Sequence, residues 1–133
     1  MDEDIGVLVV GHGSKKDYNK ELIMGFASEL ESDFEEVEYS FLSMNEPSIP
    51  ESLGKLKEKD LEKIVIFPLF LANGVHTLVD IPGVLGFEEG QRTKKVEENG
   101  KEIDLIYSNP IGLHEKLVDI GEKRIEESLE NHD

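Results

Sequence analysis

The sequence has no cysteine, only two arginines (Arg92 and Arg124), and no long apolar run. Without cysteine, disulfides, iron–sulfur clusters and thiolate zinc sites are excluded, so any metal ion must be bound by histidine, carboxylate or the substrate. Because neither a membrane-length apolar run nor a cationic leader is found, we expect no membrane insertion or secretion, and a cytoplasmic location is the default. The 14 basic residues face 30 acidic ones, for a net charge of −16. This balance argues against a nucleic-acid partner.

The 133 residues are enough for a single domain, 1–133, with one core. They amount to about half of what a two-lobed enzyme of α/β architecture needs. If catalysis needs a deeper enclosure, a second copy of the chain must supply it, which favours a homodimer.

Four apolar or alternating segments predict strands, and the segments between them predict helices. The expected strands are Ile5 to Val10, Val37 to Leu42, Ile64 to Phe70 and Ile103 to Tyr107. The expected helices are Asp17 to Ser32 with Asp17 as cap, Pro50 to about Lys59, Thr77 to Leu85 interrupted at Pro82-Gly83, and Gly112 to Leu129. The charged segment from Gly86 to Lys101 contains three glycines and is expected to be a mobile surface excursion. Alternating strands and helices predict an α/β three-layer sandwich with a four-stranded parallel sheet, similar to flavodoxin.

Two histidines each follow an apolar strand. His12 lies in Gly11-His12-Gly13-Ser14 after the first strand, and His76 follows the third strand with Gly74 just before it. In a parallel sheet the carboxyl ends of the strands share one rim, so residues 64 positions apart can face each other there. A structural role is an alternative for each histidine alone, but two such placements together favour a divalent-metal site.

Other uses of His12 fit the residues less well. A phosphohistidine motif needs an arginine just before the histidine, whereas Gly11 stands there. The segment Gly13-Ser14-Lys15-Lys16 only partly meets the requirements of a mononucleotide phosphate loop, and no P-loop or dinucleotide fingerprint is present. Ser14 also lacks the context of a hydrolase nucleophile. Metal chemistry with an open coordination shell therefore remains.

Further candidates could support the two histidines. Glu46, in the loop after the second strand, is the leading carboxylate, with a solvated loop residue as its alternative. Asp80, one helical turn after His76, could orient that imidazole. His114 is expected to be a helix-surface residue, and His132 is expected to play no part.

Three motifs match a known family. They are Val9-Val10-Gly11-His12-Gly13-Ser14, Glu46-Pro47-Ser48-Ile49-Pro50, and the segment from Phe67 through His76 to Asp80-Ile81-Pro82. Together they resemble the class II tetrapyrrole chelatases, and most of all the short archaeal CbiX type, a sirohydrochlorin cobaltochelatase that also acts as a nickel chelatase in methanogens. The resemblance extends over nearly the whole chain and implies a chelatase-like fold.

The resemblance implies a lyase-type enzyme that inserts cobalt(II) or nickel(II) into sirohydrochlorin, for cobalamin or the nickel tetrapyrrole of methanogenesis. It implies that His12 binds the metal and accepts a proton, and that His76 is the second metal ligand. It further implies that Glu46 and the segment Leu71, Ala72, Asn73, Gly74, Val75 and His76 line the substrate pocket. A symmetric homodimer is implied, and no organic cofactor.

The substrate has many carboxylates while the chain is acidic, so local cations must offset its charge. The available ones are Lys15, Lys16, Arg92, Lys94 and Lys95. Two other functions stay open: a sirohydrochlorin ferrochelatase, because histidine accepts iron as well as cobalt or nickel, and a non-catalytic metal- or ligand-binding module on the same fold.

Overall fold

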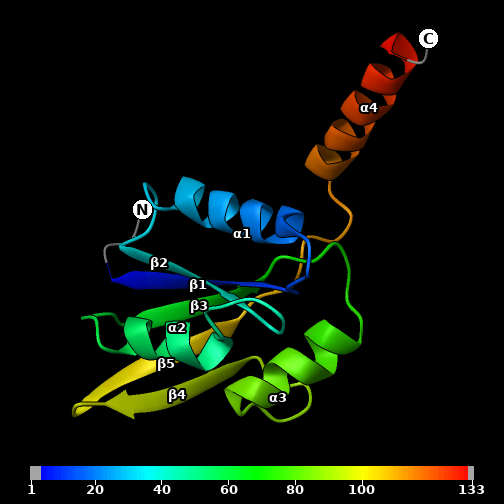
Figure 1. Ribbon diagram of the computed structural model, residues 1–133. Coiled ribbons are helices and arrows are strands. Elements are labelled where there is room, and N and C mark those ends of the chain that lie inside the picture. The colour runs from blue at the N-terminus through cyan, green and yellow to red at the C-terminus, as the bar shows by residue number, and fades with distance from the viewer. Residues whose placement is uncertain (1–3, 132–133) are drawn as a thin grey trace.

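The computed structural model describes residues 4–131 (Figure 1). The strands are β1 (Ile5–Gly11), β2 (Glu36–Phe41), β3 (Lys63–Pro68), β4 (Thr93–Glu98) and β5 (Lys101–Tyr107). The helices are α1 (Asp17–Leu30), α2 (Ile49–Lys57), α3 (Ile81–Leu85) and α4 (Glu115–Glu130), and a π-helical turn, η1 (His76–Asp80), leads directly into α3. No helix within 4–131 has the length and apolar character needed to cross a membrane.

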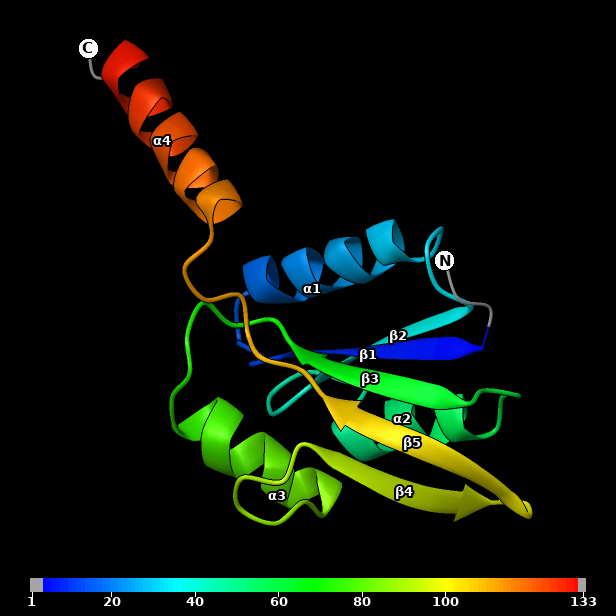
Figure 2. The same ribbon diagram turned by 180° about the vertical axis from the view of Figure 1, so that it is seen from behind.

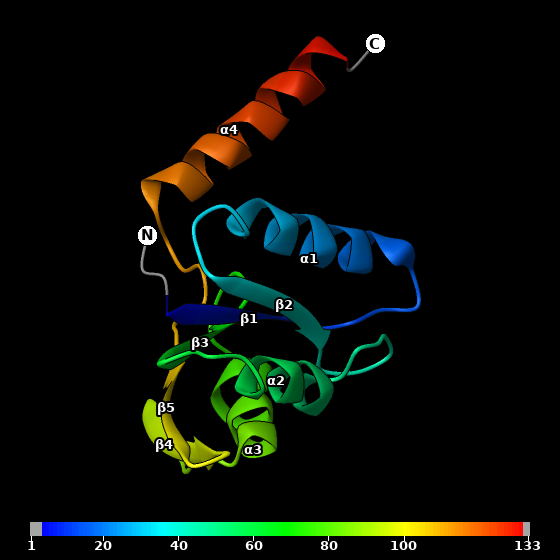
Figure 3. The same cartoon turned by 90° about the vertical axis from the view of Figure 1, so that its left-hand side faces the viewer.

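The sheet has the order β2-β1-β3-β5-β4. Its first four strands are parallel, as predicted, and only β4 runs antiparallel, beside β5. Helix α1 lies on one face of the sheet, and α2 and α3 lie on the other (Figures 2 and 3). The predicted three-layer α/β arrangement is therefore confirmed, with one additional strand.

Alternate residues of the central strands fill two cores. Val7 and Val9 of β1 pack with Ile23 and Ala27 of α1 on one face. On the opposite face, Leu8, Val10 and residues of β3 and β5 pack against α2 and α3. Because β1 is buried on both faces, its sequence is continuously apolar rather than alternating.

The prediction of a mobile excursion over Gly86 to Lys101 was wrong, since β4 lies within it. β4 and β5 form a hairpin whose turn is Asn99-Gly100, with φ of 55° and 79°. Two positive φ angles are typical of the two-residue turn that joins antiparallel strands, and Asn-Gly is its preferred sequence. β4 is the last strand of the sheet, and exposed and half-buried residues alternate along it. An edge strand with one face in solvent explains its charged sequence.

Three further predictions about the helices, concerning a cap, an interruption and a start, were wrong. Lys16, not Asp17, is the N-cap of α1, and Asp17 is its first helical residue. No break occurs at Pro82-Gly83, because Pro82 lies in the first turn of α3, where proline is tolerated. α4 begins at Glu115 rather than Gly112, since Gly112 has φ of 67°.

α4 does not cover the sheet. It projects away from the other elements in all three views (Figures 1 to 3), and none of its residues is buried. The part of the α1-side sheet face formed by β3 and β5 is consequently left without a helix.

Candidate metal centre

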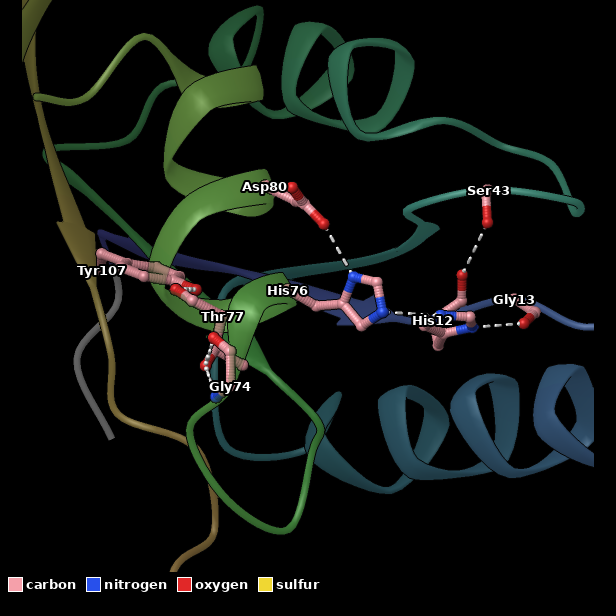
Figure 4. A network of polar contacts seen from close by, with 8 residues as sticks. All are labelled: His12, Gly13, Ser43, Gly74, His76, Thr77, Asp80 and Tyr107. Atoms are coloured by element: carbon pink, nitrogen blue, oxygen red, sulfur yellow. Dashed lines mark hydrogen bonds and ion pairs between the residues drawn. The ribbon is translucent and has the colours of Figure 1, made fainter. Parts of the chain in front are cut away.

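Two imidazoles meet at the carboxyl-terminal rim of the sheet. His12 follows β1 directly, and His76 begins η1 after the loop that leaves β3. Because β1 and β3 are paired neighbours, both histidines are delivered to the same place. The two Nε2 atoms are 3.1 Å apart and the ring centroids 4.5 Å apart (Figure 4). The two rings thus converge as the sequence predicted.

The other nitrogen of each ring identifies its tautomer. His12 Nδ1 lies 2.8 Å from the carbonyl oxygen of Gly13, and His76 Nδ1 lies 2.8 Å from Oδ2 of Asp80 (Figure 4). A carbonyl and a carboxylate only accept hydrogen bonds, so each ring donates its Nδ1–H. In a neutral ring of this tautomer the lone pair is on Nε2. The two Nε2 atoms that approach each other therefore both carry a lone pair.

Two nitrogen lone pairs this close repel each other, and a cation shared by both nitrogens relieves the repulsion. One proton makes the pair an N–H···N hydrogen bond, and a divalent ion can replace that proton by binding both nitrogens. Two nitrogens that each lie about 2.1 Å from one ion are roughly 3.0–3.4 Å apart when the N–metal–N angle is between about 90° and 110°. The observed Nε2–Nε2 separation of 3.1 Å lies in this range, so the rings are already spaced as ligands of one ion.

The coordination shell offered by the protein is incomplete. Within residues 4–131, no group of three or more histidine and acidic side chains is arranged to bind a metal ion. An ion held by His12 and His76 would keep its other coordination positions open, unlike a four-ligand structural site. Such a site can pass its ion to another ligand.

A tight loop positions His12. Gly13 has φ of 94°, and a Cβ there would overlap the carbonyl oxygen of Ser43. The Ser43 amide donates to the His12 carbonyl at 3.1 Å, while Asn19 and Asn45 accept from the amides of Gly13 and Ser14 at 3.0 and 2.8 Å. The loop after β1 is thereby held against the loop after β2. Sequence reasoning missed Asn19 and Asn45, whose only signal is that asparagine is a residue type that often bonds loop amides.

His76 is positioned by the π-helical turn η1 rather than by a tight loop. The π-helical turn places Asp80 beside it, and the Ile81 amide bonds back to the His76 carbonyl. Thr77 is buried, and its hydroxyl accepts a hydrogen bond from the Gly74 amide at 3.0 Å. The Tyr107 hydroxyl donates to the backbone carbonyl of Thr77 at 2.7 Å (Figure 4). Burial raises the pKa of Tyr107 to about 12, against the opposing charge of Arg92. Tyr107 therefore stays protonated and remains a donor at neutral pH.

One aromatic ring lies beside the imidazoles, and exposed apolar side chains flank His76 in the chain. The ring of Phe70 lies 6.3 Å from both His12 and His76, measured between centroids. Leu71 and Val75, in the segment predicted to line the substrate pocket, are exposed, as are Leu78 and Val79 of η1. The rim therefore presents an open apolar surface next to the imidazoles. Such a surface suits a large flat ligand with an apolar face.

The other predicted residues lie outside the histidine pair. Glu46 is exposed in the loop after β2 and is not part of a three-ligand group, so its role towards substrate stays a prediction. His114 is the N-cap of α4, where Nδ1 accepts from the Lys116 amide at 3.0 Å. His132 lies outside the described residues.

The expected cations divide into two groups. Lys15 and Lys16 are exposed in the loop that follows His12. Arg92 bonds Asn109 at 2.7 Å and lies 5.0 Å from the centre of the Tyr107 ring, which places it at the end of β5. By contrast, Lys95 pairs with Asp104 at 2.8 Å on the sheet face. Lys15, Lys16 and Arg92 are therefore the better candidates for contact with an anionic ligand at the rim.

The fold and the open pair of histidines are those expected of an α/β protein that binds a metal ion. Comparisons with known proteins identify its family. The family model described as CbiX matches residues 6–128. A protein of Saccharolobus islandicus named sirohydrochlorin cobaltochelatase is 40% identical over 124 residues, which cover 93% of this chain and 95% of that protein. One of the same name from Methanosarcina acetivorans is 35% identical over 131 residues, covering 97% and 100% of the two chains.

Among solved structures, the sirohydrochlorin chelatase SirB from Bacillus subtilis subspecies spizizenii, in complex with cobalt, is similar with a TM-score of 0.76 and 22% identity. The match covers 93% of this chain and 50% of the SirB chain, so this chain spans half of its length. The chain belongs to the CbiX family.

Proposed function

We propose that this protein is a sirohydrochlorin cobaltochelatase, an enzyme that inserts cobalt(II) into the tetrapyrrole sirohydrochlorin. The observation that carries this proposal is the pair of Nε2 atoms, 3.1 Å apart, at the open rim. The relatives of 35–40% identity that bear this name support the choice of substrate. Nickel(II) is a second metal substrate in the proposal, because imidazole binds both ions.

Metal insertion exchanges two pyrrole N–H protons for one divalent ion. His12 and His76 hold the ion through Nε2, and its open positions accept the pyrrole nitrogens. As the ion moves to the macrocycle, both Nε2 lone pairs become free again. One pyrrole proton can then take the place of the ion between them, with His12 as the acceptor.

The second proton must leave by another route. Two protons on the facing Nε2 atoms would place two imidazolium cations 3.1 Å apart, which like-charge repulsion disfavours. Glu46 or water takes this proton in our proposal. The exposed segment Leu71 to Val75 lies against the macrocycle, and Lys15, Lys16 and Arg92 offset its carboxylates.

We also infer that the working enzyme is a symmetric homodimer in the cytoplasm, folded as a single domain over 1–133. The size relation supports the dimer, since the similar SirB chain is about twice as long. Light scattering of the purified protein and cell fractionation test these two points.

Mixing the enzyme with sirohydrochlorin and each metal, and following the absorption spectrum, tests the proposed reaction. We expect cobalt(II) insertion to be accelerated, and His12→Ala to lose about 100-fold or more of the rate. His114→Ser is the matched control, because it removes a histidine away from the rim and keeps a good N-cap.

Three results would change the assignment. Unimpaired insertion by His12→Ala would exclude His12 as ligand and base. Faster insertion of iron than of cobalt or nickel would make the protein a ferrochelatase. Binding of the ion without any acceleration would make it a metal carrier.

A further inference from the structure

Met44, in the loop after β2, has a backbone conformation that methionine rarely adopts. Its φ is 67°, and the Asn45 amide donates to the Ser43 carbonyl at 2.8 Å. A hydrogen bond that spans one residue with a φ near this value is typical of the rare and strained form of the γ-turn. A Cβ crowds the backbone in this region, so that glycine, asparagine and aspartate are the residues normally found there. Methionine is therefore an unfavourable residue for this turn.

Within residues 4–131, one other residue that is not glycine has a positive φ. It is Asn99, with φ of 55°, in the turn of the β4–β5 hairpin. Asparagine tolerates this conformation because its short polar side chain forms local hydrogen bonds. Methionine has no such compensation. The hairpin thus contains a residue suited to its turn, whereas the backbone conformation alone does not explain the methionine at position 44.

Packing inside the chain does not account for Met44 either. The residue is 65% exposed and belongs to neither of the two cores. The turn is fixed by its neighbours, since the Ser43 amide donates to the His12 carbonyl at 3.1 Å and the Asn45 side chain accepts from the Ser14 amide at 2.8 Å. Glycine at position 44 would keep these bonds and relieve the strain. The methionine side chain is therefore available to a ligand.

The turn lies beside the metal centre, where Ser43 contacts His12 directly (Figure 4). β1 lies between β2 and β3 in the sheet, so the loops after β2 and β3 flank the loop of His12 from opposite sides. Leu71 and Val75 are exposed in the loop after β3, and Met44 is exposed in the loop after β2. A wide flat ligand centred on the histidine pair is therefore able to contact both loops.

The chemistry of methionine suits contact with a conjugated macrocycle. Its side chain is flexible, and its polarisable sulfur packs favourably against π systems. Backbone strain is also concentrated at sites that bind ligands, where the surrounding structure holds it. We propose that the Met44 side chain packs against the tetrapyrrole ring while His12 and His76 hold the ion. This inference rests on the proposed function and adds a substrate-binding residue on the β2 side of the site.

Binding of metal-free sirohydrochlorin, followed by its absorption spectrum, tests the contact. Met44→Gly and Met44→Asn both fit the turn but lack the apolar side chain, and each should bind about 10-fold more weakly than the native protein. Met44→Leu keeps an apolar side chain of similar size and should bind within about 3-fold of the native protein. Asn99→Gly is the matched control, because it changes the other positive φ position away from the rim, and its binding should be unchanged.

Two further measurements separate a substrate contact from a structural role. In urea, Met44→Gly should unfold at a midpoint at least as high as that of the native protein, because the strained residue has been replaced. By calorimetry without sirohydrochlorin, Met44→Gly should bind cobalt(II) as tightly as the native protein, because both imidazoles are retained. The affinity for the macrocycle alone should fall.

Each alternative outcome overturns the proposal. Native affinity of Met44→Gly for sirohydrochlorin would exclude the contact, and cobalt insertion by the native protein would show that the proposed function stands without it. An equal loss of affinity in Met44→Leu would exclude an apolar contact. A lower unfolding midpoint in Met44→Gly would make Met44 a packing residue, and weaker cobalt binding would make its thioether a metal ligand. A native protein that neither binds nor metallates sirohydrochlorin would exclude the proposed function and this inference together.

Discussion

The two segments that deliver the imidazoles use different physical means. His12 lies in the loop after β1, whose backbone packs tightly against the Ser43 carbonyl in the loop after β2. The Nδ1 partner of His12 is the neutral carbonyl of Gly13. His76 sits at the start of a π-helical turn, and its Nδ1 partner is the carboxylate of Asp80. The first segment depends on the absence of a side chain, and the second on the presence of a charged one.

This difference gives the two ligands different properties. A ring held by a backbone carbonyl is oriented by the fold and cannot be retuned by a single side-chain replacement. A ring that donates to a carboxylate is a stronger electron donor to a metal, and it can be retuned through that carboxylate. We therefore expect the His12 segment to be sensitive to shape and the His76 segment to be sensitive to charge.

The largest effect is expected from Gly13→Ala. The added Cβ would overlap the Ser43 carbonyl, and the φ of 94° is unfavourable for alanine, so the loop after β1 must move and His12 with it. We expect loss of cobalt binding by calorimetry and of insertion activity. Gly25→Ala, on α1, is the matched control, because no atom lies within 4 Å of a Cβ added there. Normal cobalt binding by Gly13→Ala would refute the importance of shape in this segment.

The two histidines should act as one unit. His12→Ala and His76→Ala are each expected to weaken cobalt binding by more than the roughly 10–100-fold that loss of an outer partner costs. The double variant should be scarcely worse than either single one, because one imidazole alone does not form the site. Titration calorimetry of the three variants measures this. Additive losses would indicate two separate sites rather than a shared ion.

Asp80→Asn tests the sensitivity of the His76 segment to charge. The amide oxygen still accepts from Nδ1 of His76 while the negative charge is removed, so the ring keeps its orientation. We expect cobalt affinity to fall by about 10–100-fold with an unchanged unfolding midpoint. Restored affinity in Asp80→Glu would support a role for the charge. An unchanged affinity in Asp80→Asn would reduce Asp80 to a structural residue.

Tyr107→Phe should have the smallest effect, since it removes one supporting bond from the His76 segment. Loss of the hydroxyl that donates to the Thr77 carbonyl should cost about 1 kcal/mol of unfolding free energy.

The pH dependence of this stabilisation has a definite sign. The pKa of Tyr107 is raised to about 12 in the fold, against about 10 when unfolded. Its contribution is therefore complete below about pH 10 and is lost as the pH rises towards about 12. Urea unfolding at about pH 9 and about pH 11 should show a smaller alkaline loss of stability in Tyr107→Phe than in the native protein. Equal losses in the two proteins would contradict this role of Tyr107.

Prediction from sequence failed in three places, each for a different physical reason. β4 was missed because an edge strand with one face in solvent has few apolar residues, although the Asn99-Gly100 turn is a local signal for its hairpin. The interruption expected at Pro82 does not occur, because the cost of proline depends on its place in the helix. Asn19 and Asn45 could not be recognised as supports of His12, since their partners are loop amides brought near only by folding.

Apolar runs, glycine placement and the spacing of the two histidines were enough to predict the parallel strands and the rim where the rings meet. These features depend on periodicity and on the direction of each strand, which the order of residues contains. The tautomers, the 3.1 Å approach of the two Nε2 atoms and the outward direction of α4 depend on contacts between distant segments. Such contacts exist only after the β1, β2 and β3 loops have packed together, and the folded structure alone determines them.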